Sequence, residues 1–315
     1  WALILCFAFG FNGLQAFNMT SALEYYIPDY ATNGTAVGVG IVLIVFTAFV
    51  IFGGAKRISI ITSIIVPIMA IAYILIALWT TIANIGELPA VFATIFQSAF
   101  NFQSIAGGFA GSVVMLGIKR GLFSNEAGMG SAAIPAASAA TDSPARQGYV
   151  NMTGVFFDTT VICTVTGLCI CASGVLGTAD ASGGQVNGVA LTALAFKTVL
   201  GPLGGLLVSL GIVLFAFSTI LGWEFCGETA FAFLFGRRAI PLYRILFALA
   251  AFLGATQSLE VVWNLSDIFN ALMAVPNLIS LLLLSGTAAR ELEAFQPEIR
   301  RGRRLRQRRA VRRAL

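Results

Sequence analysis

Residues 117–135 read Gly-Ile-Lys-Arg-Gly-Leu-Phe-Ser-Asn-Glu-Ala-Gly-Met-Gly-Ser-Ala-Ala-Ile-Pro, and we call them the signature stretch. It places two cations, an Asn-Glu pair and four glycines between apolar segments that are long enough to lie in a membrane. An ionisable group in such a setting is costly unless it is buried with a partner. The stretch is therefore either a functional site or a cytoplasmic loop in which Ser124 caps the start of a helix.

The composition predicts an all-α polytopic membrane protein. Of the 315 residues, 58% are hydrophobic and 10% are charged, and the mean hydropathy is +0.89. The long apolar segments contain Ser, Thr and Gly, which favours helices over the alternating pattern of a membrane barrel. The chain has no histidine, and its five cysteines lie in apolar runs without metal-binding spacing. We therefore predict that the chain is not an enzyme and needs no cofactor.

Apolar runs predict the positions of the membrane helices. They cover residues 2–23, 36–52, 58–83, 149–173, 203–225, 245–255 and 261–284, with an amphipathic piece at 90–102 that is too short to cross. We expect a transmembrane domain over 1–289 and a basic tail over 290–315. Basic and acidic residues occupy alternate connections, which by the positive-inside rule places the signature stretch and the tail at the cytoplasmic face of the cell (inner) membrane.

The basic tail begins near Arg290 and includes Arg300, Arg301, Arg303 and Arg304. A polybasic segment next to a membrane span is typical of a cytoplasmic anchor to anionic lipid. Binding to nucleic acid is the other interpretation of such a segment, and the position beside a span disfavours it.

Several polar residues inside apolar runs are candidates for a substrate or ion pathway. Gln15 and Asn18 are three residues apart and share a helix face, so they either contact substrate or join helices. The run from 102 to 118 is interrupted by small residues, which is typical of discontinuous helices in transporters and also of close helix packing. Its glycines include Gly107, Gly108 and Gly111.

The later spans carry further candidates. Ser218 and Thr219 offer oxygen atoms of the kind that sodium prefers, or they bond back to their own helix. Thr219 and Trp223 share one face. Asp158 lies within a span, and the Asn264, Asp267 and Asn270 side chains form one stripe that predicts a polar contact inside the protein. The Glu224 and Glu228 side chains also share a face, which we interpret as a solvated face at a cytoplasmic helix end.

Residues 119–131, Lys-Arg-Gly-Leu-Phe-Ser-Asn-Glu-Ala-Gly-Met-Gly-Ser, resemble the signature of the sodium:alanine symporter family, whose members move alanine or glycine with a cation. The runs Thr-Ile-Leu-Gly-Trp at 219–223 with Gly227-Glu228, and Asn-Ala-Leu-Met-Ala-Val-Pro-Asn-Leu at 270–278, also look like that family. The resemblance extends to about Leu284 and leaves the basic tail outside it.

The resemblance implies a leucine-transporter-like fold, with two inverted five-helix repeats around a substrate site at the membrane midplane. On that plan the chain begins at the third core helix. It would be N-terminally truncated, with about eight core helices and a short surface helix. The broken first helix, which normally supplies much of the substrate and sodium cage, would be absent.

Site roles follow from the resemblance. Gln15 resembles a substrate-contacting amide, Thr219 and Trp223 resemble pocket residues, and Ser218 and Thr219 lie where this fold places sodium-binding hydroxyls. The full set of substrate candidates is Gln15, Asn18, Gly107, Gly108, Gly111, Thr219 and Trp223. Ser124, Asn125, Glu126 and Gly128 of the signature stretch would cap the inner half of the broken sixth helix and act as an inner gate.

Two departures from the family pattern are visible. The family commonly has Asn-Ser after Gln15-Ala16, where this chain has Phe17-Asn18. After Ser131 the family often shows Pro-Ile-Ala-His, where residues 133–136 of this chain read Ala-Ile-Pro-Ala. The first departure lies beside a substrate candidate, so it bears on which amino acid is bound.

The function predicted from the sequence is symport of a small neutral amino acid, such as alanine or glycine, with sodium or another cation by alternating access. A transporter of the same fold for another small amino acid is the nearest alternative. A channel would need a continuous pore lined by rings of charge or carbonyl groups, and the scattered amides do not supply one.

Overall fold

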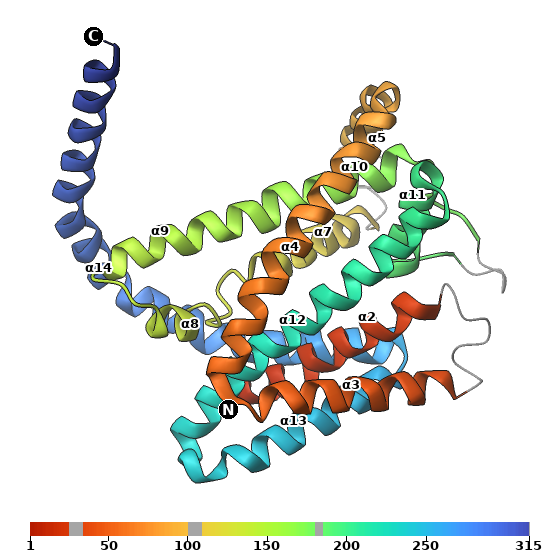
Figure 1. Cartoon of the computed structure of the whole chain (residues 1–315), viewed down its shortest axis with the longest axis horizontal. Coiled ribbons are helices and arrows are strands. Elements are labelled where there is room, and N and C mark those ends of the chain that lie inside the picture. The colour runs from red at the N-terminus through yellow and green to blue at the C-terminus, as the bar shows by residue number, and fades with distance from the viewer. Residues whose placement is uncertain (25–33, 100–108, 180–184, 315) are drawn as a thin grey trace.

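The computed structural model describes residues 1–24, 34–99, 109–179 and 185–314, and these residues fold into a helical bundle (Figure 1). Of the elements, η1 and η3 are π-helical and η2 and η4 are 3₁₀-helical. In chain order the elements are α1 (Ala2–Leu5), η1 (Cys6–Phe11), α2 (Asn12–Glu24), α3 (Thr35–Ile51), α4 (Gly54–Ala83), η2 (Ile85–Glu87), α5 (Leu88–Ala99), α7 (Phe109–Asn125), α8 (Ala133–Ser138), α9 (Pro144–Val155), η3 (Phe156–Ile162), α10 (Cys163–Ala172), α11 (Gly188–Leu200), α12 (Pro202–Phe235), η4 (Arg237–Ala239), α13 (Ile240–Ala255) and α14 (Leu259–Ala314).

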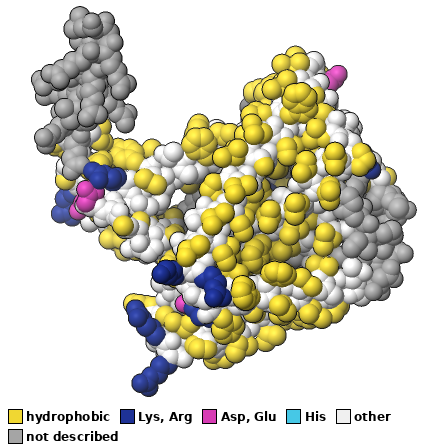
Figure 2. All heavy atoms as spheres, viewed as in Figure 1, with side chains coloured by type: hydrophobic (Ala, Val, Ile, Leu, Met, Phe, Trp, Pro, Cys, Tyr) yellow, Lys and Arg dark blue, Asp and Glu magenta, His cyan; other side chains and the backbone are white. Residues whose placement is uncertain are grey.

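Six helical segments of the described chain are long and apolar enough to cross a membrane, which confirms the prediction of a multi-pass helical protein. Two shorter apolar helices, α3 and α11, accompany them. Much of the apolar surface faces outward, and Figure 2 shows hydrophobic side chains covering the viewed face. Lipid can cover such a surface, whereas water could not do so without a large free-energy cost. The six segments are Ala2–Leu23, Gly54–Ala83, Pro144–Ala172, Pro202–Phe235, Arg237–Ala255 and Leu259–Pro297.

Several helices are longer than the apolar runs that predict them. Prolines in the first helical turn start α9, α12 and α13 before those runs begin, because proline is favoured there and its missing N–H needs no partner. At the other end, α14 continues past residue 284 through the Arg-rich tail to Ala314. Arginine is a good helix former, so the loss of hydrophobicity does not end the helix.

The centre of the bundle is formed by α2, α12 and α13. Ala16, Ile220 and Phe247 contribute to one buried cluster across these three helices. Small residues bring α2 and α13 into close contact, since a Cβ atom at Gly254 would overlap the backbone of Gly13. Such packing of small residues is typical of helices in membranes.

Two of the membrane-length helices contain a π-helical segment. Residues 6–11 of the first helix and residues 156–162 of the α9–α10 helix have the wider turn. A π segment inserts an extra residue into a turn, which leaves carbonyl groups less regularly paired and often occurs at functional sites. Asp158 lies in the second of these segments.

Candidate functional site

The signature stretch contains an irregular loop, residues 126–132, between α7 and α8, and we call it the signature loop. Glu126, Gly128 and Gly130 all have positive φ, at 53°, 76° and 86°. Glycine adopts this conformation readily, but it is unusual for glutamate. Ser124 lies near the C-terminal end of α7, so the expectation that it caps the start of a helix is wrong. The reason is that the apolar run before it continues as helix up to Asn125.

Helix α14 holds the signature loop in place. The side-chain amide of Asn277 donates a hydrogen bond to the carbonyl oxygen of Gly128 at 2.9 Å. A Cβ atom at Gly128 would lie 2.8 Å from Leu278, and one at Gly130 would lie 2.8 Å from Asn277. The two family-like runs, 119–131 and 270–278, are therefore in direct contact in the folded chain.

The end of α7 is joined to the π segment of the α9–α10 helix. The Ser124 hydroxyl donates a hydrogen bond to Asp158 Oδ2 at 3.0 Å. The Asn125 amide donates one to the Thr159 hydroxyl at 3.5 Å. Asp158, a polar candidate within a predicted span, therefore has a hydrogen-bond partner on α7.

Of the three stripe residues on α14 (Asn264, Asp267 and Asn270), Asp267 makes the polar contact expected inside the protein. Asp267 pairs with Lys119 Nζ at 2.5 Å and with both terminal nitrogens of Arg120 at 3.3 Å. The Arg120 guanidinium also lies 3.8 Å from the ring centre of Trp263, a favourable cation–π distance.

This ion-pair cluster joins α7 to α14. Asp267 is eight residues inside α14, and its neighbour Ser266 lies next to Gly10 of the first helix. Asp267 balances one of the two positive charges, and the Lys119 and Arg120 side chains remain 49% and 34% exposed. The expectation that Lys119 and Arg120 lie at the cytoplasmic face stays a prediction.

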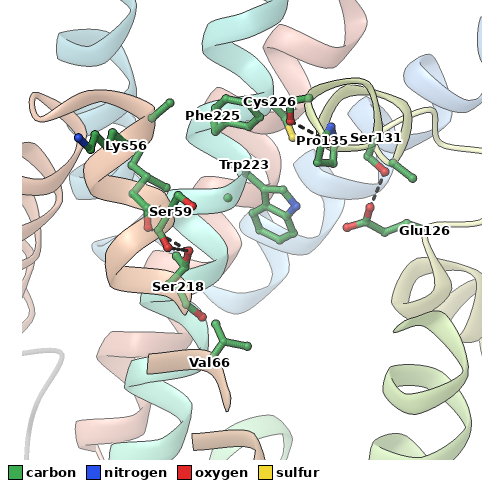
Figure 3. A pocket seen from close by; sticks show the side chains of 16 residues that line it. Lys56, Ser59, Val66, Glu126, Ser131, Pro135, Ser218, Trp223, Phe225 and Cys226 are labelled. Carbon is green, nitrogen blue, oxygen red and sulfur yellow. Dashed lines mark hydrogen bonds between the residues drawn. The ribbon is translucent and has the colours of Figure 1, made fainter. Parts of the chain in front are cut away.

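A cavity of about 680 Å³ lies between α4, α12 and the region from the signature loop to α8 (Figure 3). Its polar residues are Lys56, Ser59 and Thr62 on α4, Glu126, Ser131 and Ser138 on the signature side, and Ser218 on α12. The rest of the α12 wall consists of Gly222, Trp223, Phe225 and Cys226. Within the signature loop, the Ser131 hydroxyl donates a hydrogen bond to the Glu126 carboxylate. The cavity has the size of a small-molecule site, for which about 300–1,000 Å³ is usual.

Trp223 separates this cavity from the first helix. Its indole stacks on Phe7 with ring centres 6.2 Å apart, and it packs against Phe11 at 4.8 Å. Phe11 in turn contacts Phe123 of α7 at 5.0 Å. Aromatic side chains from three elements thus form one buried layer at the level of the signature loop.

The predicted sodium-binding hydroxyls bond to their own helix in this structure. Ser218 and Thr219 both donate to the carbonyl oxygen of Phe215, at 2.9 and 2.8 Å. Ser218 lines the cavity, whereas Thr219 is not among its lining residues. In the part of the chain that the structure describes, no three His, Cys, Asp or Glu residues cluster as a metal site would require.

The predicted substrate residues are only partly brought together. Trp223 lines the cavity, but Gln15 and Asn18 do not, and their amides hydrogen-bond to each other at 3.2 Å. Gly107 and Gly108 lie outside the described residues, and Gly111 falls within the continuous helix α7.

The expectation that Glu224 and Glu228 form a solvated face is wrong. Glu224 is completely buried, and Arg244 of α13 pairs with Glu228 through Nε at 2.6 Å and a terminal nitrogen at 3.0 Å. The α12–α13 turn brings this arginine back onto the two carboxylates. The spacing of Glu224 and Glu228 indicated a shared face, and Arg244 after the turn was the signal that could have predicted a buried ion pair.

These features define the class of protein. Membrane-length helices, a cavity between them and an irregular polar loop beside it are the features of a multi-pass membrane transporter. The chain belongs to the sodium:alanine symporter family, whose model matches residues 1–309. The match extends beyond Leu284 into the basic tail. The motifs in the sequence placed the end of the resemblance near Leu284, which was too early.

Named relatives agree with this assignment. The sodium/alanine symporter AgcS of Methanococcus maripaludis is 52% identical over 83% of this chain and 57% of its own length. The amino-acid carrier protein AlsT of Bacillus subtilis is 37% identical over 96% and 63%. The sodium/proton-dependent alanine carrier protein of Bacillus sp. PS3 is 33% identical over 96% and 69%. The chain thus spans about three fifths of the length of the first two relatives.

Proposed function

We propose that this chain forms part of a secondary active symporter that couples the entry of sodium, or another cation, to the uptake of a small neutral amino acid such as alanine or glycine. The observation that carries the proposal is that the signature loop and the α12 residues Ser218 and Trp223 face the same cavity. The names of the relatives, which refer to alanine with sodium or with sodium and protons, support the substrate class and the type of coupling.

The substrate site is proposed to include the cavity wall at Trp223, whose indole would limit the length of the amino-acid side chain. Gln15, Asn18 and Thr219 would join it in a different state of the transport cycle, since here the two amides bond to each other. The small residues Gly107, Gly108 and Gly111 are proposed to let substrate approach the backbone.

Sodium is proposed to bind at the Ser218 and Thr219 hydroxyls. Each hydroxyl donates its proton to the Phe215 carbonyl, so its oxygen lone pairs stay free to face a cation. An oxygen atom of this kind is the ligand that a hard cation prefers. The remaining ligands would come from groups that face these hydroxyls during the cycle.

The signature loop is proposed to act as an inner gate. Ser124 and Asn125 join α7 to the π segment, and Asn277 holds Gly128, so the loop is linked to two long helices. A relative movement of those helices would displace Glu126 at the cavity wall. This is the kind of linkage that alternating access requires.

The fold is proposed to be the leucine-transporter-like inverted repeat, with residues 1–289 as the membrane domain and 290–315 as a tail. We also propose that the protein lies in the inner membrane with its tail in the cytoplasm, beside anionic lipid. The arginine-rich composition of the tail supports this orientation.

Uptake by purified protein in liposomes tests the proposal. An inward sodium gradient should drive accumulation of labelled alanine or glycine above equilibrium, and collapsing the gradient should abolish it. Accumulation that does not depend on any cation gradient would reject symport. Conductance that greatly exceeds the rate of substrate turnover would instead favour a channel, and accumulation of only a different amino acid would favour the related alternative.

A further inference from the structure

Glu224 is a buried carboxylate without a hydrogen bond. Its side chain is 0% exposed, and neither Oε1 nor Oε2 has a hydrogen-bond partner within the described residues. The cation that it approaches is Arg244, whose Nε lies 3.7 Å from Oε1. That distance is too long for a hydrogen bond, so the carboxylate has given up its hydration without a direct replacement.

Arg244 pairs with the neighbouring carboxylate, that of Glu228. It makes two hydrogen bonds to Glu228, at 2.6 and 3.0 Å, in the two-point geometry that matches a guanidinium to a carboxylate. Glu228 lies one helical turn after Glu224. If both carboxylates were ionised, two negative charges would share one positive charge, and the excess charge would fall on the group with no exposure to solvent.

The surrounding groups do not neutralise this charge. From α13, Tyr243 presents a buried hydroxyl that has no hydrogen-bond partner among the described residues, and its oxygen packs over Gly227. Phe7 of η1 lies beside Gly227, three residues after Glu224 on α12. On the other side, Arg244 faces the ring of Phe52 at 6.0 Å. Besides Glu228, the ionisable group nearest on α12 is Cys226, a buried free thiol.

We propose that Glu224 is a proton-binding site, and that it carries a proton as a neutral carboxylic acid while α12 and α13 are packed as described. Glu228 then remains ionised and pairs with Arg244. This arrangement leaves no excess charge in the cluster. The bound ligand is a proton on one oxygen of Glu224, and releasing it requires that water or a second cation reach this buried position.

Sodium fits this site less well than a proton does. A sodium ion would need several oxygen ligands. The Glu228 carboxylate is already paired with Arg244, and Tyr243 contributes a single hydroxyl. The guanidinium at 3.7 Å would also repel a second cation. A proton needs one lone pair and no additional space.

The proton site is separate from the cavity. Trp223 and Glu224 are consecutive on α12, so their side chains point about 100° apart around the helix. Trp223 and Cys226 line the cavity, whereas Glu224 is not one of its lining residues. The inference therefore rests on the α12–α13 contact and does not depend on the proposed transport function.

Infrared difference spectroscopy of the reconstituted protein tests this proposal without measuring transport. At neutral pH the wild-type protein should show the carbonyl stretch of a protonated carboxylic acid, with a shift on exchange into deuterium oxide. The Glu224→Gln variant should lose this band. Glu228→Gln should lose it as well, because Arg244 is then free to pair with Glu224 and stabilise the ionised form. The exposed Glu260→Gln variant is the matched control and should keep the band.

Three results would overturn the proposal. The first is that wild-type protein shows no carboxylic acid band at neutral pH, a result that needs no variant to fold. The second is an unchanged band in a folded Glu224→Gln variant. The third is a wild-type band that appears only when sodium is removed, which would make sodium the ligand of this carboxylate. None of these results bears on amino-acid uptake, so they leave the proposed function untouched.

Discussion

At Thr219 a single hydroxyl is proposed to bind sodium. Replacing it with valine keeps the shape of the side chain and removes the oxygen, so sodium-dependent uptake should require about tenfold more sodium. The measurement is the sodium concentration that gives half-maximal uptake. Thr229→Val is the matched control, because Thr229 makes the same bond to a carbonyl one turn earlier, at 2.8 Å, but is exposed. Equal sodium dependence in both variants would reject the role of Thr219.

Glu126 is proposed to act in the gate and not in substrate binding. The Glu126→Gln variant keeps the size of the side chain and removes the charge that accepts the Ser131 hydrogen bond. It should still bind the amino acid but fail to transport it, because the linkage of the signature loop is weakened. Equilibrium binding and uptake are measured on the same preparation, with Glu87→Gln as an exposed control. Loss of binding would place Glu126 in the substrate site instead.

The sequence indicated some site residues by residue type alone, such as glycines and charges between apolar segments. The unusual density of glycine and charge in residues 117–135 marked the segment that contains the signature loop. The family resemblance implied Trp223 as a pocket residue, and Trp223 lines the cavity. The state of Glu224 was not predictable from its neighbours on α12. Its burial depends on Arg244, which the fold brings back across a turn.

At the scale of the elements, the contact between α12 and α13 depends on the absence of a side chain. A Cβ atom at Gly227 would overlap the hydroxyl of Tyr243. Gly227→Ala should therefore lower the free energy of unfolding by about 1–3 kcal/mol. Thermal unfolding in detergent measures the change.

The matched control for this substitution lies on the same helix. Gly211 has open space around its missing side chain, so Gly211→Ala should leave stability unchanged or raise it by up to about 1 kcal/mol. Adding Tyr243→Phe to Gly227→Ala removes the overlapping hydroxyl and should recover part of the loss. If the two alanine variants melt at the same temperature, the contact does not limit packing.

Helix positions were largely predictable from hydrophobic runs, but helix ends were not. Prolines extended α9, α12 and α13 toward their N-termini, and arginines let α14 continue beyond its apolar part. The two π segments left no hydrophobic signal, because a wider turn changes the register without changing the composition.

At the scale of the whole molecule, the orientation in the membrane remains a prediction. We expect the α12–α13 turn, with Arg237 and Arg238, to be cytoplasmic and the α13–α14 turn, with Glu260, to lie outside. In a Cys163→Ser background, which removes the exposed native thiol, Arg238→Cys should react with a membrane-impermeant thiol reagent only in inverted vesicles. Glu260→Cys should react only in right-side-out cells. The opposite labelling pattern would invert the topology.

Charge patterning predicts which helix ends share a side of the membrane, and this stays a prediction, but it did not predict the pairing of Lys119 and Arg120 with Asp267. This pairing was not visible in the sequence because Asp267 is almost 150 positions away from the two cations. Only the fold brings these side chains of α7 and α14 together. Composition alone cannot separate an unpaired cation from one that pairs with a carboxylate far away in the sequence.

The contact between the signature loop and α14 has a consequence for how this sequence can evolve. A side chain at Gly130 would meet Asn277, and one at Gly128 would meet Leu278, while both glycines also have positive φ. Substitutions in the loop and in α14 are therefore expected to be epistatic in specific pairs. A smaller residue at 277 would relieve crowding at 130 but would remove the hydrogen bond to Gly128. A change in only one of the two segments would therefore disturb their contact. We expect the signature loop and α14 to change together during evolution.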